Sequence, residues 1–69
     1  MAPVRITLNG EPFGFEGSHS IESLLASLGI DSRRVAVEHN LDVVKRARYA
    51  EVPVVEGDQV EIVNFVGGG

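Results

Sequence analysis

Only one segment of the chain has the apolar spacing of an α-helix. Its apolar residues recur at intervals of three and four positions: Ile21, Leu24, Leu25 and Leu28. This spacing places them on one face of a helix. Ser18-His19-Ser20 offers hydroxyl N-caps just before the segment, and Gly29 supplies a left-handed C-cap just after it. We therefore predict a helix over about Ile21–Leu28, and in a chain of 69 residues its apolar face must be buried against a sheet.

The segment before this helix has the pattern of a β-hairpin. Val4, Ile6 and Leu8 alternate with polar residues, which is typical of a strand with one buried face. Asn9-Gly10 follows, and this dipeptide readily adopts the positive φ angles of a tight turn. A second strand, Pro12–Glu16, is therefore predicted to return along the first with its two phenylalanines on one face.

The segment after the helix predicts three further strands. They are Val35–Val37, Asp42–Val44 after a turn at Asn40-Leu41, and Gln59–Phe65 after a turn at Glu56-Gly57-Asp58. The stretch Lys45–Val55 is predicted to be irregular. Within it Tyr49 is expected to pack on the core, and Pro53 excludes a central strand nearby.

This order of elements predicts an α+β fold of the β-grasp (ubiquitin-like) class, in which a mixed sheet of about five strands wraps around one helix. A ferredoxin-like arrangement would need a second full helix, and Ser32–Arg34 and Arg46–Tyr49 are too short to form one. We expect one β-grasp domain over residues 1–66 and a flexible C-terminal glycine tail over residues 67–69.

Composition limits the partners of the chain. Six basic residues against ten acidic ones give a net charge of −4, which would repel a nucleic acid or an anionic membrane surface. There is no cysteine, no apolar run of the roughly 20 residues that span a bilayer, and no start typical of a signal peptide. We expect a cytoplasmic protein that binds neither nucleic acid nor membrane, and whose protein partners present basic docking surfaces.

The side chains offer few catalytic groups. His19 and His39 have no cysteine or close second histidine with which to form a metal site, and no glycine-rich phosphate loop ending in Gly-Lys-Ser/Thr is present. The serines around the helix are better explained as caps than as nucleophiles. Lys45, Arg46 and Arg48 are better explained as a solvated loop than as an anion site. The expectation is therefore a carrier protein that is not an enzyme, with no catalytic residue, metal or bound cofactor of its own.

The unusual feature is the end of the sequence, where the last strand runs into Val66-Gly67-Gly68-Gly69. Four extended residues reach about 13 Å beyond the sheet, and glycines without a Cβ can pass through a narrow channel in another protein. We therefore expect Gly67 and Gly68 to lie in a partner's channel. The alternative is that the glycines are only a flexible end.

The chemistry of this tail resides in the α-carboxylate of Gly69. With an ordinary pKa of about 3.5 it is ionised at neutral pH, and it can attack the α-phosphate of an ATP held by a partner enzyme. The product is an acyl-adenylate. A sulfur nucleophile converts that adenylate to a thiocarboxylate, and a cysteine thiol converts it to a thioester.

Alternation in the last strand predicts a docking surface. If Val60 and Ile62 face the helix, the residues that alternate with them on the strand face away from it: Glu61, Val63 and Phe65. Val63 and Phe65, with Val66 beside the tail, are therefore candidates for contact with a partner. The alternative is that Phe65 folds over an edge of the core.

With these elements in place, the chain resembles the ThiS family of sulfur carriers in thiamine biosynthesis over essentially its whole length. The resemblance rests on several motifs: Leu8-Asn9-Gly10-Glu11, Ser20-Ile21-Glu22-Ser23-Leu24-Leu25, Leu28-Gly29-Ile30, Arg33-Arg34-Val35-Ala36-Val37-Glu38, Val43-Val44-Lys45-Arg46, Glu56-Gly57-Asp58-Gln59-Val60-Glu61-Ile62-Val63 and Val66-Gly67-Gly68-Gly69. Two positions depart from the family pattern. Lys45 stands where proline is expected, and the Asn40-Leu41-Asp42 turn lacks the usual glycine.

The resemblance implies a function and a set of partners. Gly69 would be adenylated by an E1-like adenylyltransferase of the ThiF type and converted to a thiocarboxylate with sulfur from a donor protein. It would then deliver sulfur to a thiazole synthase of the ThiG type. Three alternatives remain open: the small subunit of molybdopterin synthase (MoaD), a ubiquitin-like protein modifier, and a non-covalent β-grasp binding module.

Overall fold

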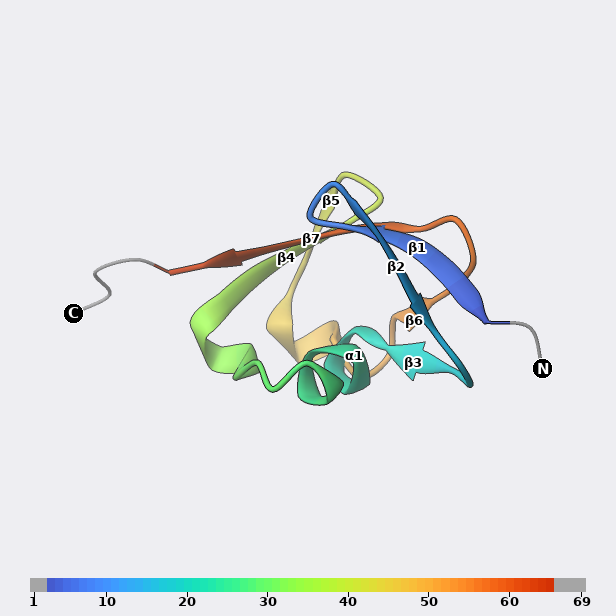
Figure 1. Cartoon of the computed structure of the whole chain (residues 1–69). Coiled ribbons are helices and arrows are strands. Elements are labelled where there is room, and N and C mark those ends of the chain that lie inside the picture. The colour runs from blue at the N-terminus through green and yellow to red at the C-terminus, as the bar shows by residue number, and fades with distance from the viewer. Residues whose placement is uncertain (1–2, 66–69) are drawn as a thin grey trace.

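The computed structural model describes residues 3–65 of the chain. The α-helix of these residues, α1 (Ile21–Ser27), lies against one face of a five-stranded sheet (Figure 1). The strands of the sheet run in the order β2 (Glu11–Phe15), β1 (Val4–Leu8), β7 (Gln59–Asn64), β4 (Val35–His39) and β5 (Asp42–Val44). This arrangement confirms the predicted β-grasp class.

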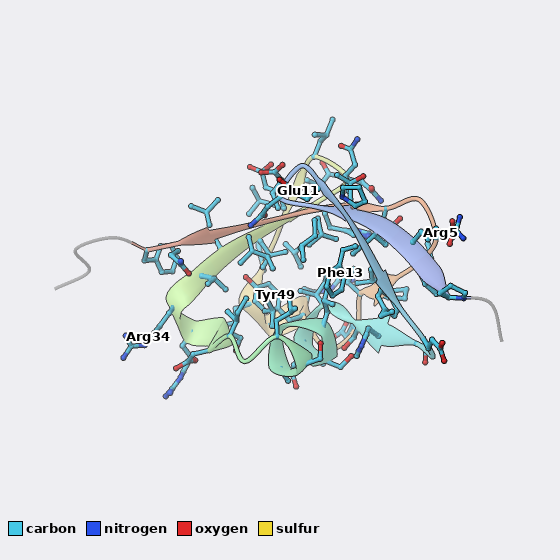
Figure 2. The ribbon with its side chains drawn as sticks, viewed as in Figure 1. Arg5, Glu11, Phe13, Arg34 and Tyr49 are labelled. Carbon is cyan, nitrogen blue, oxygen red and sulfur yellow. The ribbon has the colours of Figure 1, made fainter. Side chains whose placement is uncertain are left out.

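The N-terminal hairpin forms as the sequence predicts. Asn9 and Gly10 have φ angles of 50° and 80°, the left-handed values that a two-residue hairpin turn requires. Val4 pairs with Phe15 and Leu8 with Glu11, so the second strand begins one residue earlier than expected and ends one residue earlier. The hairpin forms one side of the sheet and turns Phe13 toward the helix (Figure 2).

Strand β7 lies at the centre of the sheet and makes it mixed. It is parallel to β1, with Thr7 opposite Gln59, and antiparallel to β4, with Val35 opposite Asn64. The pairing with β1 takes in only Gln59 and Val60 of β7. From Glu61 to Asn64 the strand is paired with β4 alone, so β4 is the strand that holds the last part of β7.

The helix has the caps that the sequence predicts. The Ser20 hydroxyl accepts a bond from the Ser23 backbone N–H at 3.1 Å, and the Ser23 hydroxyl accepts one from the Ser20 N–H at 2.9 Å. Two further N–H groups of the first turn donate to backbone carbonyls outside the helix, Ile21 to Val52 at 2.9 Å and Glu22 to Tyr49 at 3.0 Å. The helix start is thus fully bonded and unavailable for an anion.

The core lies between the helix and the sheet. Its buried residues come from β1, α1, β4, β6 (Pro53–Val54) and β7, together with Tyr49: Ile6, Ile21, Leu24, Leu25, Val35, Val37, Tyr49, Val54 and Val60. Tyr49, which is only 2% exposed, lies between the two layers and confirms the packing role predicted for it (Figure 2). Within residues 3–65 no helix is both long and apolar enough to cross a membrane.

The prediction that Lys45–Val55 is irregular is partly wrong. Pro53–Val54 forms strand β6, which pairs with β3 (His19–Ser20) in a separate two-stranded sheet. Two residues are too short to leave a period-two pattern in the sequence, which is why both strands were missed. Pro53 stays out of the main sheet as expected. Two 3-10 turns, η1 (Ser32–Arg34) and η2 (Arg46–Arg48), complete the described structure.

Candidate functional site

The site predicted from the sequence lies mostly beyond the described residues. Val66, Gly67, Gly68 and Gly69 all fall outside residues 3–65. The structure does show the base from which they continue. Strand β7 ends at Asn64, and the Phe65 N–H donates a 3.0 Å hydrogen bond to the Arg34 carbonyl. The last described residue is therefore bonded to Arg34, the residue just before β4.

The outer face of the sheet, away from the helix, carries exposed apolar residues around an acidic pair. Val60 is buried in the core while Val63 is 56% exposed, as the alternation predicts. Val63 lies opposite Ala36, and the next outward pair along the same two strands is Glu61 opposite Glu38. Val43, which is 74% exposed, lies beside Glu38 on β5. We call Val63, Ala36, Glu61, Glu38 and Val43 the outer patch.

Phe65, two residues after Val63, is also exposed, at 62%. It follows the last residue of β7 and lines a groove of about 280 Å³ that also includes the core residues Val35 and Tyr49. Phe65 is therefore accessible to solvent and lies at an edge of the core. Its exposure agrees with the first interpretation offered from the sequence and its place beside core residues agrees with the second, while contact with a partner stays a prediction.

The groove beside Phe65 has an apolar floor and basic walls. Its lining residues are Arg33, Val35, Ala36, Val44, Arg46, Tyr49 and Phe65, and we call it the arginine groove. The Arg46 Nη1 lies 3.5 Å from the Arg33 carbonyl, so η2 approaches η1 across its mouth. The sequence predicted only a solvated loop at Arg46, because nothing in the pattern shows that η1 and η2 meet.

Asp31 organises the arginines of η1. Its carboxylate accepts bonds from the Arg33 side chain at 3.1 and 3.0 Å and from the Arg33 backbone N–H at 2.9 Å, and it lies 3.7 Å from the Arg34 Nε. The side-chain hydrogen bonds from Arg33 are the main reason why the pKa of Asp31 falls to about 2. The same pair raises the pKa of Arg33. These groups stay charged at any physiological pH.

The two histidines make structural contacts. The His19 Nδ1 lies 2.8 Å from the Ser23 hydroxyl, and its ring meets the Phe15 ring edge-on with centroids 4.7 Å apart. The His39 Nε2 lies 2.7 Å from a carboxylate oxygen of Asp58. Among residues 3–65, no three His, Cys, Asp or Glu side chains gather closely enough to hold a metal ion.

Asp58 is the buried polar residue that the sequence did not reveal. It is only 6% exposed and accepts bonds from the Val55 N–H at 2.9 Å and from the Asn40 amide at 3.2 Å, besides its contact with His39. Burial alone would raise its pKa, but these hydrogen bonds outweigh burial and lower the pKa. The network joins the β4–β5 turn to the start of β7. Only the register of those strands brings Asn40 and Asp58 together.

The two positions that depart from the family pattern have backbone angles that the expected residues favour. Asn40 and Leu41 have φ angles of 53° and 75°, so the turn is left-handed even though neither residue is glycine. Asn40 holds it through its N–H, which donates to the Gln59 carbonyl at 2.8 Å, and through its side-chain oxygen, which accepts from the Gln59 N–H at 2.9 Å. Lys45, with φ −69°, has the angle that proline would impose.

Comparisons with known proteins agree on one family. Residues 6–69 match the model of the ThiS family. The chain is 38% identical to the sulfur carrier protein ThiS of Bacillus subtilis over 65 residues, which are 93% of this chain and 98% of that protein. Its structure is similar to the crystal structure of a thiamine biosynthesis protein (ThiS) from Geobacter metallireducens, with a TM-score of 0.84, 35% sequence identity, and coverage of 96% of this chain and all of that one.

A longer protein also contains a similar segment. The chain is 50% identical over 66 residues to a thiazole synthase of Paramagnetospirillum magneticum. The match takes in 96% of this chain but spans only about a fifth of that synthase, 20% of its length. The greater part of the synthase therefore has no counterpart in the present sequence.

Proposed function

Because the chain belongs to the ThiS family, we propose that it is a sulfur carrier in thiamine biosynthesis and that it serves an enzyme without being one. The observation that carries this proposal is the match to a sulfur carrier over 98% of that protein's length. The family match also continues through residue 69, so it includes the glycine tail.

In this proposal the Gly69 α-carboxylate is the group that changes. One of its oxygens attacks the α-phosphorus of ATP on an E1-like adenylyltransferase of the ThiF type, and pyrophosphate leaves. Sulfur from a sulfur donor protein, at the oxidation level of sulfide, then attacks the carbonyl carbon and expels AMP. A terminal thiocarboxylate remains. The ionised carboxylate needs no general base, so a chain without catalytic side chains suffices.

The residues before Gly69 have a steric role in the proposal. Gly67 and Gly68 occupy the channel that leads to the partner's ATP, where any Cβ would widen the chain. Ordering each tail residue costs about 1 to 2 kcal/mol of conformational entropy. Contacts outside the channel must offset this cost, and we assign them to Val63, Phe65 and Val66. The exposure of Val63 and Phe65 supports this assignment.

A thiazole synthase of the ThiG type is the proposed recipient of the sulfur. The similarity to a segment of the Paramagnetospirillum synthase supports this choice, because there a domain of this kind is covalently part of the protein that the sulfur would reach. A separate chain would need a docking surface in place of the covalent link. The outer patch offers apolar contacts for that purpose.

Isotopically labelled sulfur tests the function and separates it from its alternatives. The chain is incubated with the adenylyltransferase, ATP, the labelled donor protein and thiazole synthase with its small substrates, and the destination of the label is followed by mass spectrometry. We expect the label in the thiazole. Label in a pterin dithiolene when molybdopterin synthase partners are supplied instead, or reductant-resistant conjugates on lysines, would assign the chain to a rival function.

A further inference from the structure

The basic residues of this acidic chain gather at one end of the molecule. Five of its six Lys and Arg residues lie in or beside η1 and η2: Arg33, Arg34, Lys45, Arg46 and Arg48. Arg34 lies at the end of the molecule where β7 finishes, and the remaining cation, Arg5, lies at the opposite end (Figure 2). The cations are therefore unevenly distributed in a chain whose net charge is −4.

Part of this positive charge is not neutralised within the fold. Arg33 and Arg34 share the single carboxylate of Asp31, and Arg48 pairs with Glu51 at 3.2 Å. Within the described part of the chain, no carboxylate lies within ion-pair distance of Arg46. Arg34 is also open to a partner, because its side chain is 83% exposed.

The same end presents an apolar surface between the cations. The arginine groove is floored by Val35 and Tyr49 and is bordered by Phe65, the last described residue before the tail. Arg33 and Arg46 line it directly. An apolar floor strengthens charge pairing at the rim, because it excludes water from one side of each ion pair.

The length of the tail limits which anions on a partner these arginines can contact. When the tail is extended, its last residue is about 13 Å from Phe65. A nucleotide bound at the tip would therefore lie beyond side chains that start on η1 and η2. In a complex with such a partner, the arginines would instead meet the rim of the channel, the surface around its entrance, where Asp and Glu side chains are the available anions.

Electrostatics indicates that the acidic surface belongs to the adenylating partner and not to the recipient of the sulfur. The tail carboxylate and ATP are both anionic and repel each other as they approach, so the encounter needs attraction elsewhere on the two surfaces. A positive end that meets a negative rim supplies it and raises the association rate. The recipient of the sulfur presents no such repulsion from ATP.

We propose that the arginine groove is the docking site for an acidic rim on the adenylating partner. Carboxylates of that rim pair with Arg46 and Arg34, and an apolar side chain beside them packs on Phe65 and Tyr49. This inference rests on the proposed function. It also reverses, at this end of the molecule, the expectation from net charge that a partner should be basic.

Charge reversal at matched positions tests the proposal. Arg46→Glu changes an exposed residue that lines the groove, and Arg34→Glu changes an exposed residue next to the lining residue Arg33; these are the two groove variants. Arg5→Glu makes the same change of charge at the far end. Calorimetry measures the Kd of each variant for the adenylyltransferase of the same organism without ATP, at low and at high salt. We expect each groove variant to bind at least about tenfold more weakly than the wild type at low salt, and Arg5→Glu to stay within about twofold.

Thermal unfolding followed by circular dichroism first establishes that each variant is folded. If Arg46→Glu is not folded, Arg34→Glu alone tests the proposal. Equal effects of Arg46→Glu and Arg5→Glu, no effect of either groove variant, or no binding by the wild type would each overturn the proposal. Because binding is measured without ATP, the outcome is separate from the proposed function. A wild-type protein that binds the adenylyltransferase but never becomes a thiocarboxylate would contradict the proposed function. The Kd values of the arginine variants could still be compared in that case, so the docking proposal would still be tested.

Discussion

Glu38 and Glu61 lie directly opposite each other on the exposed outer face of the sheet, as paired residues of the antiparallel strands β4 and β7. Like charges at such a pair destabilise a sheet. Val43 and Val63 flank the pair, so the outer patch combines an unfavourable acidic contact with exposed apolar surface. Such an arrangement suits a surface that meets a cationic, apolar partner better than one that remains in water.

Removing one charge of this pair should stabilise the isolated protein. We expect Glu61→Gln to raise the free energy of unfolding by about 0.2 to 1 kcal/mol at low salt, because the repulsion from Glu38 is lost. Urea unfolding at low and high salt measures the change. Glu16→Gln, an exposed acid outside the sheet pairings, is the control and should have little effect. A Glu61→Gln variant less stable than the wild type would show that Glu61 makes a favourable contact instead.

A charge placed on the apolar part of the outer patch should weaken docking without unfolding the protein. Val63→Arg changes a side chain that is 56% exposed, so its melting temperature should stay close to that of the wild type. Binding to thiazole synthase, measured by calorimetry, should fall by at least about tenfold if Val63 lies in the centre of the contact. Leu41→Arg alters an even more exposed apolar residue at a turn and is the matched control. Unchanged binding by Val63→Arg would place the contact elsewhere.

The buried carboxylate of Asp58 should make stability depend on acid pH. Its pKa is lowered in the folded protein, so its contribution is complete above the ordinary pKa of 3.8 and is lost as the pH falls through the folded value. Asp58→Asn should cost about 1 to 3 kcal/mol at pH 7, because charge-assisted bonds to Val55 and His39 are weakened. It should also lose less stability than the wild type on acidification.

Urea unfolding of wild type and variant at neutral and acid pH measures both effects. Asp42→Asn, in an exposed strand position, is the control and should track the wild type. Equal pH dependence of Asp58→Asn and the wild type would mean that other carboxylates, such as Asp31, govern acid unfolding.

The left-handed turn between β4 and β5 should be more stable with glycine at position 41 than with the leucine that is there. Leu41 has a φ of 75° and is 80% exposed, so its side chain adds strain and little packing. We expect Leu41→Gly to stabilise the protein by about 1 kcal/mol, since the steric cost of a left-handed Cβ is removed. Leu41→Ala retains that Cβ and should change stability much less. If the two variants behave alike, the effect comes from the exposed apolar side chain and the strain is small.

The sequence revealed the elements with strong periodicity and missed contacts set by register. The hairpin at Asn9-Gly10, the helix from Ile21 and the exposure of Val63 all follow from local patterns, which report which face of an element is buried. The pairing of Asn40 with Asp58 does not, because they lie eighteen positions apart in the sequence and only the alignment of β4 with β7 joins them.

The arginine groove was missed for a related reason. Arg33 and Arg46 lie on different 3-10 turns, and each turn by itself is typical of a solvated loop. Their approach depends on the short strand β5, which ends at Val44 and leaves the start of β4 open beside η2. No pattern in the sequence shows where an edge strand stops short of its neighbour.

The central claim is that the Gly69 carboxylate carries the sulfur, and intact mass measures it directly. The protein is incubated with its adenylyltransferase, ATP and a sulfur donor, and its mass is compared with that of a variant extended by one alanine after Gly69. We predict that in the wild type one oxygen is replaced by sulfur within the C-terminal peptide, and that the extended variant is unchanged. Sulfur located at any other residue, or equal conversion of the extended variant, would contradict the account.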